Sequence, residues 1–167
     1  MGTLKHTLMT VLLYRLVPEQ HVVIIERDGQ SDRLGGPGYV KINRISESFG
    51  PVIPFGPQKP AEVVLEDVRS ADGDSFSLRF TITYSFDPRR CNLQKTPKLV
   101  RKAPDIQEKI LQNYGRQIAR NVVGEYSSPD LRLGRTPEKI EQEIKSRLYR
   151  EVRFAGIELY NRPFRLG

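Results

Sequence analysis

The chain has 167 residues, 28% of them charged, and it carries a net charge of +7 at pH 7. Its length fits one domain, or one domain with two halves, and its mean hydropathy of −0.48 favours a water-soluble body over a bundle of membrane-spanning segments. The single cysteine, Cys91, excludes an internal disulfide, so we expect it to be a small packing or surface residue.

The beginning of the chain contains a short apolar run. It extends from Thr7 to Tyr14 before Arg15 interrupts it, whereas a membrane-spanning helix needs about 20 apolar residues. We therefore interpret residues 1–10 as an N-terminal apolar stub. Any membrane contact of this chain is expected to be peripheral, unless a further segment supplies an anchor.

The first half of the sequence has the patterns of strands and turns. Val11–Val17 and His21–Glu26 are rich in β-forming residues, and the second run lacks polar alternation, which predicts a strand covered on both faces. The Gly-rich stretch Leu34–Val40 is interpreted as a structural turn, because it lacks the ending of a phosphate-binding loop. Phe49–Pro60 contains four prolines and is expected to be extended along a sheet edge.

A hairpin is expected next. Ala61–Val68 has the composition of a short strand, and residues 71–74 contain the Asp-Gly step of a tight turn. From Phe76 to Phe86 apolar and polar residues alternate, so every second side chain is expected to face a core.

The second half has the patterns of two helices. Asp105 is the expected N-cap of the first helix and Gly124 its end, and an apolar stripe repeats every four residues: Ile106, Ile110, Tyr114, Ile118 and Val122. Thr136 is the expected N-cap of the second helix and Gly156 its end, with a matching stripe: Ile140, Ile144, Leu148 and Val152. The stripes predict that four residues are buried: Ile110, Ile118, Ile144 and Leu148.

Together these patterns predict an α+β fold. A mixed, mainly antiparallel β half covers residues 11–88, a packed helix pair covers 105–155, and a short closing strand covers 157–160. We treat residues 11–167 as a single domain.

Positive charge is concentrated in one part of the chain. Between Pro88 and Arg120 nine Lys and Arg residues accompany two acidic residues, while the rest of the chain has 18 of each sign. A local basic block attracts phosphate groups of lipid head groups or nucleic acid, although a solvated loop and helix face has the same composition.

Several short segments follow one another in an order that is typical of a known family. They are Val17–Gly29, Gly36–Tyr39, Val52–Phe55, Tyr84–Pro88 and Phe154–Leu159. On these residues the chain resembles the SPFH/Band 7 family of stomatin, prohibitin, flotillin and HflK/C proteins, over about residues 11–165. Members usually carry a membrane helix or hairpin before this domain and a coiled coil after it.

The resemblance implies an SPFH-like fold and a non-catalytic, membrane-associated scaffold domain. Such domains self-associate as homo-oligomers and organise membrane lipids or membrane proteins, including proteases and channels, at a membrane surface expected here to be cytoplasmic. The apolar stub Leu8–Leu13 could enter the bilayer, and six basic residues are the candidates for contact with anionic lipids: Arg89, Arg90, Lys95, Lys98, Arg101 and Lys102.

Two other classes of function were weighed. A nucleic-acid-binding module could use the basic segment 89–120, but Tyr114 is the sole aromatic residue there, and base stacking needs interleaved aromatics. An enzyme would need clustered ligands or a nucleophile with a base, whereas His6 and His21 are fifteen residues apart. We therefore expect no catalytic residue, no metal, no cofactor and no small-molecule substrate.

Overall fold

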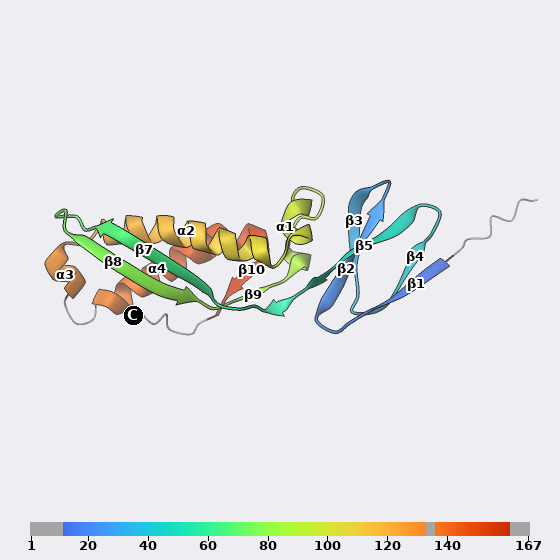
Figure 1. Ribbon diagram of the computed structural model, residues 1–167, viewed down its shortest axis with the longest axis horizontal. Coiled ribbons are helices and arrows are strands. Elements are labelled where there is room, and N and C mark those ends of the chain that lie inside the picture. Colours follow the sequence, from blue (N-terminus) through green and yellow to red (C-terminus); the bar gives the residue numbers. More distant parts are fainter. Residues whose placement is uncertain (1–11, 133–135, 161–167) are drawn as a thin grey trace, which may run out of the picture.

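The computed structural model describes residues 12–132 and 136–160, without the side chains of residues 136 and 137. The molecule is elongated, with a β-rich end and an end where helices cover two long strands (Figure 1). The α+β expectation is confirmed, since antiparallel strands occupy the first half and helices with a closing strand occupy the second. The expected apolar stub, residues 1–10, lies outside the described residues.

The β-rich end contains two small antiparallel sheets. In one, β1 (Leu12–Val17) pairs with β4 (Gly38–Asn43). In the other, β2 (His21–Arg27) lies between β3 (Gln30–Gly35) and β5 (Glu47–Pro54), so β5 is an edge strand as its prolines predicted.

Strand β2 is buried on both faces, as its unbroken apolar run predicted. Its four central residues are at most 1% exposed. Val22 and Ile24 face a cluster on one side of the sheet that contains Ile53, Phe86, Cys91 and Val100. Val23 and Ile25 face the opposite cluster, which contains Val17, Val40 and Ile42 from β1 and β4.

The Gly-rich stretch forms the tight connection between β3 and β4. Gly36 and Gly38 have φ values of 95° and 100°, which side chains other than glycine rarely adopt. A Cβ atom on Gly36 would also lie 2.8 Å from the side chain of Val17. The sharp turn with positive φ values that the glycines predicted is therefore confirmed.

The long alternating segment of the sequence is divided into two strands. β7 (Ala61–Arg69) pairs with β8 (Ser75–Ile82) through the expected turn, but β8 ends before Thr83. A separate strand, β9 (Tyr84–Phe86), then takes different neighbours. It lies between β6 (Gly56–Pro57) and β10 (Ile157–Leu159), so the expectation of one continuous strand is corrected.

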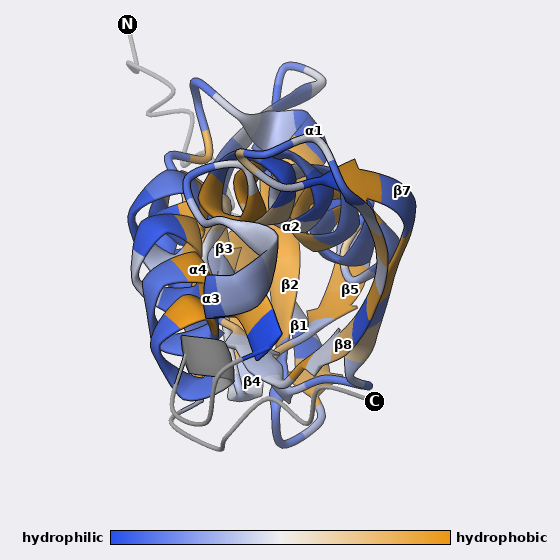
Figure 2. Cartoon of the chain, turned by 90° about the vertical axis from the view of Figure 1, so that its left-hand side faces the viewer, coloured by the Kyte–Doolittle hydropathy of each residue, from blue (hydrophilic) through white to orange (hydrophobic). Residues whose placement is uncertain are grey.

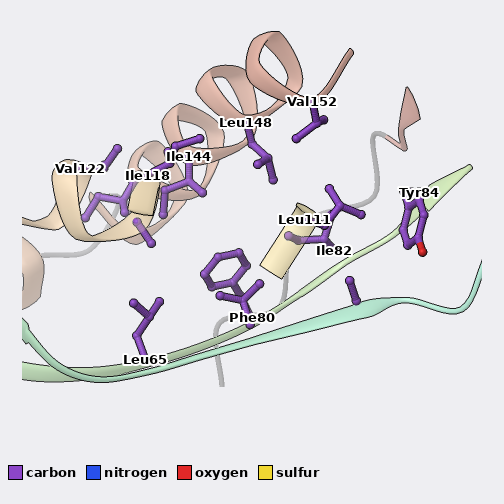
Figure 3. Packing of buried hydrophobic residues seen from close by; sticks show 14 of the residues in the cluster. Leu65, Phe80, Ile82, Tyr84, Leu111, Ile118, Val122, Ile144, Leu148 and Val152 are labelled. Atoms are coloured by element: carbon purple, nitrogen blue, oxygen red, sulfur yellow. The ribbon is translucent and has the colours of Figure 1, made fainter. Parts of the chain in front are cut away.

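Two long helices, α2 (Asp105–Val123) and α4 (Thr136–Val152), cover one face of the β7–β8 pair. Their apolar side chains point toward the strands in Figure 3, and their outer faces are hydrophilic in Figure 2. Two short helices, α1 (Pro97–Arg101) and α3 (Ser128–Arg132), were not expected. Gly156 ends the turn after α4 in a left-handed conformation, with φ of 71°.

The buried face of α2 differs from the expected stripe. Ile118 and Val122 are buried, but Ile106, Ile110 and Tyr114 are only partly covered. The centre of the face consists of Gln107, Leu111, Gly115, Ile118, Ala119 and Val122. Each step of four residues drifts about 40° around the axis, so the five-residue stripe of α2 drifts about 160°, more than one buried face spans, whereas the shorter four-residue stripe of α4 drifts about 120°. On α4 the expected stripe is confirmed, because all four residues are at most 5% exposed.

Two local expectations about α2 also change. Pro104 occupies the N-cap position and Asp105 is the first helical residue, so Asp105 is not the cap. A glycine at the centre of a helix is expected to weaken it, but Gly115 lies where α2 approaches the sheet closely. A Cβ atom there would lie 3.1 Å from the side chain of Val63.

The corrected face of α2 can be tested with a matched pair of substitutions. Leu111 is fully buried, so Leu111→Ala should lower the free energy of unfolding by about 2–5 kcal/mol because it leaves a cavity. Ile106→Ala should cost less than Leu111→Ala, about 1 kcal/mol, since its side chain is only partly buried and a smaller cavity results. Urea denaturation measures both values, and equal costs would contradict the assignment of the face.

A carboxylate in the β7–β8 turn gives a prediction about pH. The Ser70 hydroxyl and then the backbone N–H and hydroxyl of Ser128 donate to Asp72, which lowers the pKa of Asp72 from 3.8 to about 2. A lowered folded-state pKa contributes stability above pH 3.8 that is lost as the pH falls toward 2. The Tm difference between wild type and Asp72→Asn should therefore be largest near neutral pH and shrink in this window, and a difference that does not change with pH would contradict this assignment.

Candidate membrane-contact surface

The six expected lipid-facing residues lie on the segment that joins β9 to α2, between the two ends of the molecule (Figure 1). Arg89 and Arg90 belong to a short 3-10 helix, η1 (Pro88–Arg90), and Lys95 follows in a loop. Lys98 and Arg101 are on α1, and Lys102 is its C-cap. The six residues do not form one free basic surface, because three of them are engaged within the molecule.

Arg101 fastens α1 to the β-rich end. Its guanidinium donates to the carboxylate of Glu26 on β2, and its Nε donates to Ser31 Oγ on β3 at 3.2 Å. Gly50 leaves room for this arrangement, since a Cβ there would lie 2.9 Å from Glu26 Oε1. Charge-assisted hydrogen bonds of this kind make Arg101 a structural clamp.

Arg89 and Arg90 are also engaged. Arg89 donates to both carboxylate oxygens of Asp87, at 2.8 and 3.0 Å, and its guanidinium lies 4.8 Å from the centre of the Phe55 ring. Burial raises the pKa of Asp87, but the hydrogen bonds and charge of Arg89 outweigh that effect and hold the pKa below its usual value. Arg90 pairs with Glu158 of β10 at 3.3 Å.

The remaining three candidates are exposed lysines. Lys95, Lys98 and Lys102 have no ion-pair partner among the residues that the structure describes. Three more exposed basic residues, Lys109, Arg116 and Arg120, follow on the solvent-facing side of α2. Their spacing of seven and four residues places them on one face of the helix. Tyr114 is not part of that face, because its ring packs edge-on against Phe154 with centroids 6.3 Å apart.

An apolar surface lies on the outer face of the β1–β4 pair. On β1 it consists of Leu12, Tyr14 and Leu16, which are 38%, 58% and 61% exposed. On β4 it includes Tyr39, which is 80% exposed and lies directly opposite Leu16 in the pairing register. Lys41 is exposed opposite Tyr14. We call these five residues the outer face; they lie at one extremity of the molecule, on the strands β1 and β4 of Figure 1.

The inner face of the same strands packs against β2 and β5 along β4, while Leu13 of β1 stays 43% exposed. Val40 and Ile42 are buried there, and Arg15 turns toward β5. Its guanidinium donates to the carbonyl oxygen of Gly50 at 3.5 Å and lies 5.8 Å from the centre of the Phe49 ring. Because Arg15 points inward, it does not interrupt the apolar outer face.

The expectations from the sequence covered this surface only in part. The expected stub Leu8–Leu13 ends inside β1, and Leu12 and Leu13 are described there as exposed. The sequence signal for the β1 part of this surface was the period-two spacing of Leu12, Tyr14 and Leu16. Tyr39 could not be added to it, because only the pairing of β1 with β4, more than 20 residues away, brings Leu16 and Tyr39 together.

Catalytic or metal-binding chemistry would need clustered ligands or a reactive nucleophile among the described residues. No group of three potential metal ligands lies together among them. Cys91 is 8% exposed, and burial followed by the charge of Asp87 raises the pKa of its thiol to about 11, so the thiol is neutral at physiological pH. None of the helices within the described ranges is long and apolar enough to span a bilayer.

Comparison with known proteins gave one family. The model of the SPFH domain / Band 7 family matches residues 15–163, which is nearly the whole chain. A search of curated proteins returned no match.

The division of the basic residues into clamps and free side chains predicts different stability effects. Arg101→Gln should lower the free energy of unfolding by about 1 kcal/mol, because it removes a partly exposed ion pair and leaves Glu26 without its partner. Lys98→Gln should leave the melting temperature unchanged, since that ammonium group has no such partner. Thermal denaturation of the two variants side by side tests this, and equal melting temperatures would refute the clamp.

Proposed function

We propose that this chain, which belongs to the SPFH/Band 7 family, acts as a non-catalytic scaffold that contacts a membrane through the outer face of its β1–β4 pair. Membrane-associated scaffolds are the function for which the family is known. The observation that carries the proposal is the concentration of exposed Leu and Tyr side chains on this face, at one extremity of the molecule.

The composition of the outer face suits the boundary between water and lipid. Leu12 and Leu16 can enter the acyl region, where full burial of a leucine side chain gains about 1.5–3 kcal/mol. Tyr14 and Tyr39 combine an apolar ring with a hydroxyl, and tyrosine is enriched at the head-group level of membrane proteins. Lys41 lies beside them and adds attraction to anionic lipids of about 1 kcal/mol.

The exposed lysines have a secondary role in this proposal. Lys95, Lys98 and Lys102 lie on the segment between the two ends of the molecule, away from the outer face (Figure 1). Their contribution is long-range attraction to an anionic membrane, which salt screens. Arg89, Arg90 and Arg101 are removed from the original set of lipid-facing candidates, because internal partners occupy them.

Self-association and the organisation of lipids or membrane proteins complete the proposal. Membership of the SPFH/Band 7 family supports peripheral attachment at a membrane surface and assembly as a homo-oligomer. We assign the attachment to the cytoplasmic side of the membrane. Membrane proteases or channels are the partners that such an assembly would hold. The nucleic-acid alternative would use exposed basic residues of segment 89–120, namely Lys95, Lys98, Lys102, Lys109, Arg116 and Arg120, and no aromatic side chain lies on the basic face of α2.

Vesicle flotation tests the membrane contact. The wild-type chain should float with vesicles that contain anionic lipid, and the double variant Leu16→Asp/Tyr39→Asp should not. Both substituted side chains are more than 60% exposed, so the fold should tolerate the change. As a control, Val64→Asp places one of the two added charges on an exposed residue of β7 at the other end of the molecule, and this variant should still float.

Two outcomes would count against the proposal. Flotation that persists in the Leu16→Asp/Tyr39→Asp variant but is lost on Lys95→Glu/Lys98→Glu/Lys102→Glu would move the contact to the lysines. Failure of the wild type to float, together with retention of RNA by the α2 residues in a competition assay, would favour the nucleic-acid alternative.

A further inference from the structure

Strand β1 has an unpaired edge. Within the described ranges its one neighbouring strand is β4, so the backbone N–H and C=O groups along its other side have no strand partner. Five of its six residues are exposed. An exposed, apolar edge strand is a template for pairing with another chain, because such a pairing satisfies a whole row of backbone groups.

The usual protections of an edge strand are missing from β1. It contains no proline, its pairing with β4 has no bulge, and Arg15 is its single charged residue. The side chain of Arg15 turns inward to Gly50 and Phe49, so it does not guard the edge. By contrast, β4 carries the exposed Lys41, which is the kind of residue that keeps strands from joining.

We propose that β1 pairs antiparallel with β1 of a second copy, so that Tyr14 of one copy lies opposite Tyr14 of the other. This register places Leu12 of each copy opposite Leu16 of the other on the outer face, and Leu13 opposite Arg15 on the inner face. A shift of the pairing by one residue would set outer-face residues against inner-face residues. A shift by two residues in one direction would bring Arg15 opposite Arg15, and like charges directly opposite each other are destabilising. A shift by two in the other direction would centre the pairing on Leu13 and would pair only Leu12, Leu13 and Tyr14 within β1.

The proposed dimer has closed symmetry. Both copies use the same edge, so the contact is isologous and is complete with two copies. The two β1–β4 pairs then form one four-stranded sheet, in the order β4–β1–β1–β4. The apolar outer faces of both copies lie on the same side of that sheet, so the apolar area offered to a membrane doubles.

Pairing and membrane contact should reinforce each other, and in this respect the inference rests on the proposed function. Backbone groups without partners are costly near hydrocarbon, where water cannot satisfy them. Unpaired backbone groups along the β1 edge therefore make insertion of the outer face less favourable. Pairing of two β1 strands removes this free-energy cost. Vesicles that contain anionic lipid should accordingly increase the fraction of paired chains.

Single-cysteine cross-linking of the full chain tests the register. In a Cys91→Ala background, Tyr14→Cys should form a disulfide-linked dimer under mild oxidation, because directly opposite residues have Cα atoms about 4.5–5.5 Å apart, which is within the range that a disulfide spans. Leu12→Cys alone and Leu16→Cys alone should stay monomeric, since each residue is about 13 Å from its own copy in this register. A mixture of Leu12→Cys and Leu16→Cys chains should cross-link again.

The outcomes separate this inference from the membrane proposal. The expected result is a yield of Tyr14→Cys dimer at least several-fold above that of either leucine variant, and a further rise when vesicles are added. Cross-linking of Arg15→Cys in place of Tyr14→Cys, or no dimer with any variant on vesicles to which the chain floats, would overturn the pairing alone. Dimers in solution without flotation would overturn the membrane contact and leave the pairing intact.

Discussion

The structure depends on the burial of β2 on both faces. Val22 and Ile24 pack against residues from β5, β9 and α1, while Val23 and Ile25 pack against β1 and β4. One strand is therefore shared by two small cores, neither of which contains enough apolar residues to be stable by itself. This sharing fixes the position of the β1–β4 pair on one side and of the basic segment on the other. The clamp from Arg101 to Glu26 adds a polar connection at the same junction.

Most of the buried apolar core lies at the helical end of the molecule, whereas the outer face lies at the β-rich end. Eighteen buried residues from β7, β8, β9, α2, α4 and the closing segment form one cluster at the helical end. The outer faces of the helices remain hydrophilic (Figure 2). Exposed apolar side chains of β1 and β4 are therefore a separate feature at the opposite extremity among the described residues, which is the feature that the proposed membrane contact uses.

The two proposals address the same strand from different sides. The outer face of β1 presents apolar side chains, and its edge presents unpaired backbone groups. A membrane can cover the apolar side chains but cannot pair the backbone groups. A second copy can pair the backbone groups but leaves the apolar side chains uncovered. A scaffold that uses both would connect attachment to assembly, since chains brought to a surface meet at a higher effective concentration.

The sequence alone determined the elements whose signals are local. The unbroken run of β2, the turn glycines at Gly36 and Gly38, and the i, i+4 stripe of α4 depend on side-chain periodicity and backbone sterics, and all three were predicted correctly. Charge counting likewise located the basic segment. Only the tertiary structure decided which arginines have internal partners, because Glu26 and Arg101 are 75 residues apart. It also decided that Leu16 and Tyr39 share one face, since strand pairing between distant segments is a property of the folded chain and not of either segment.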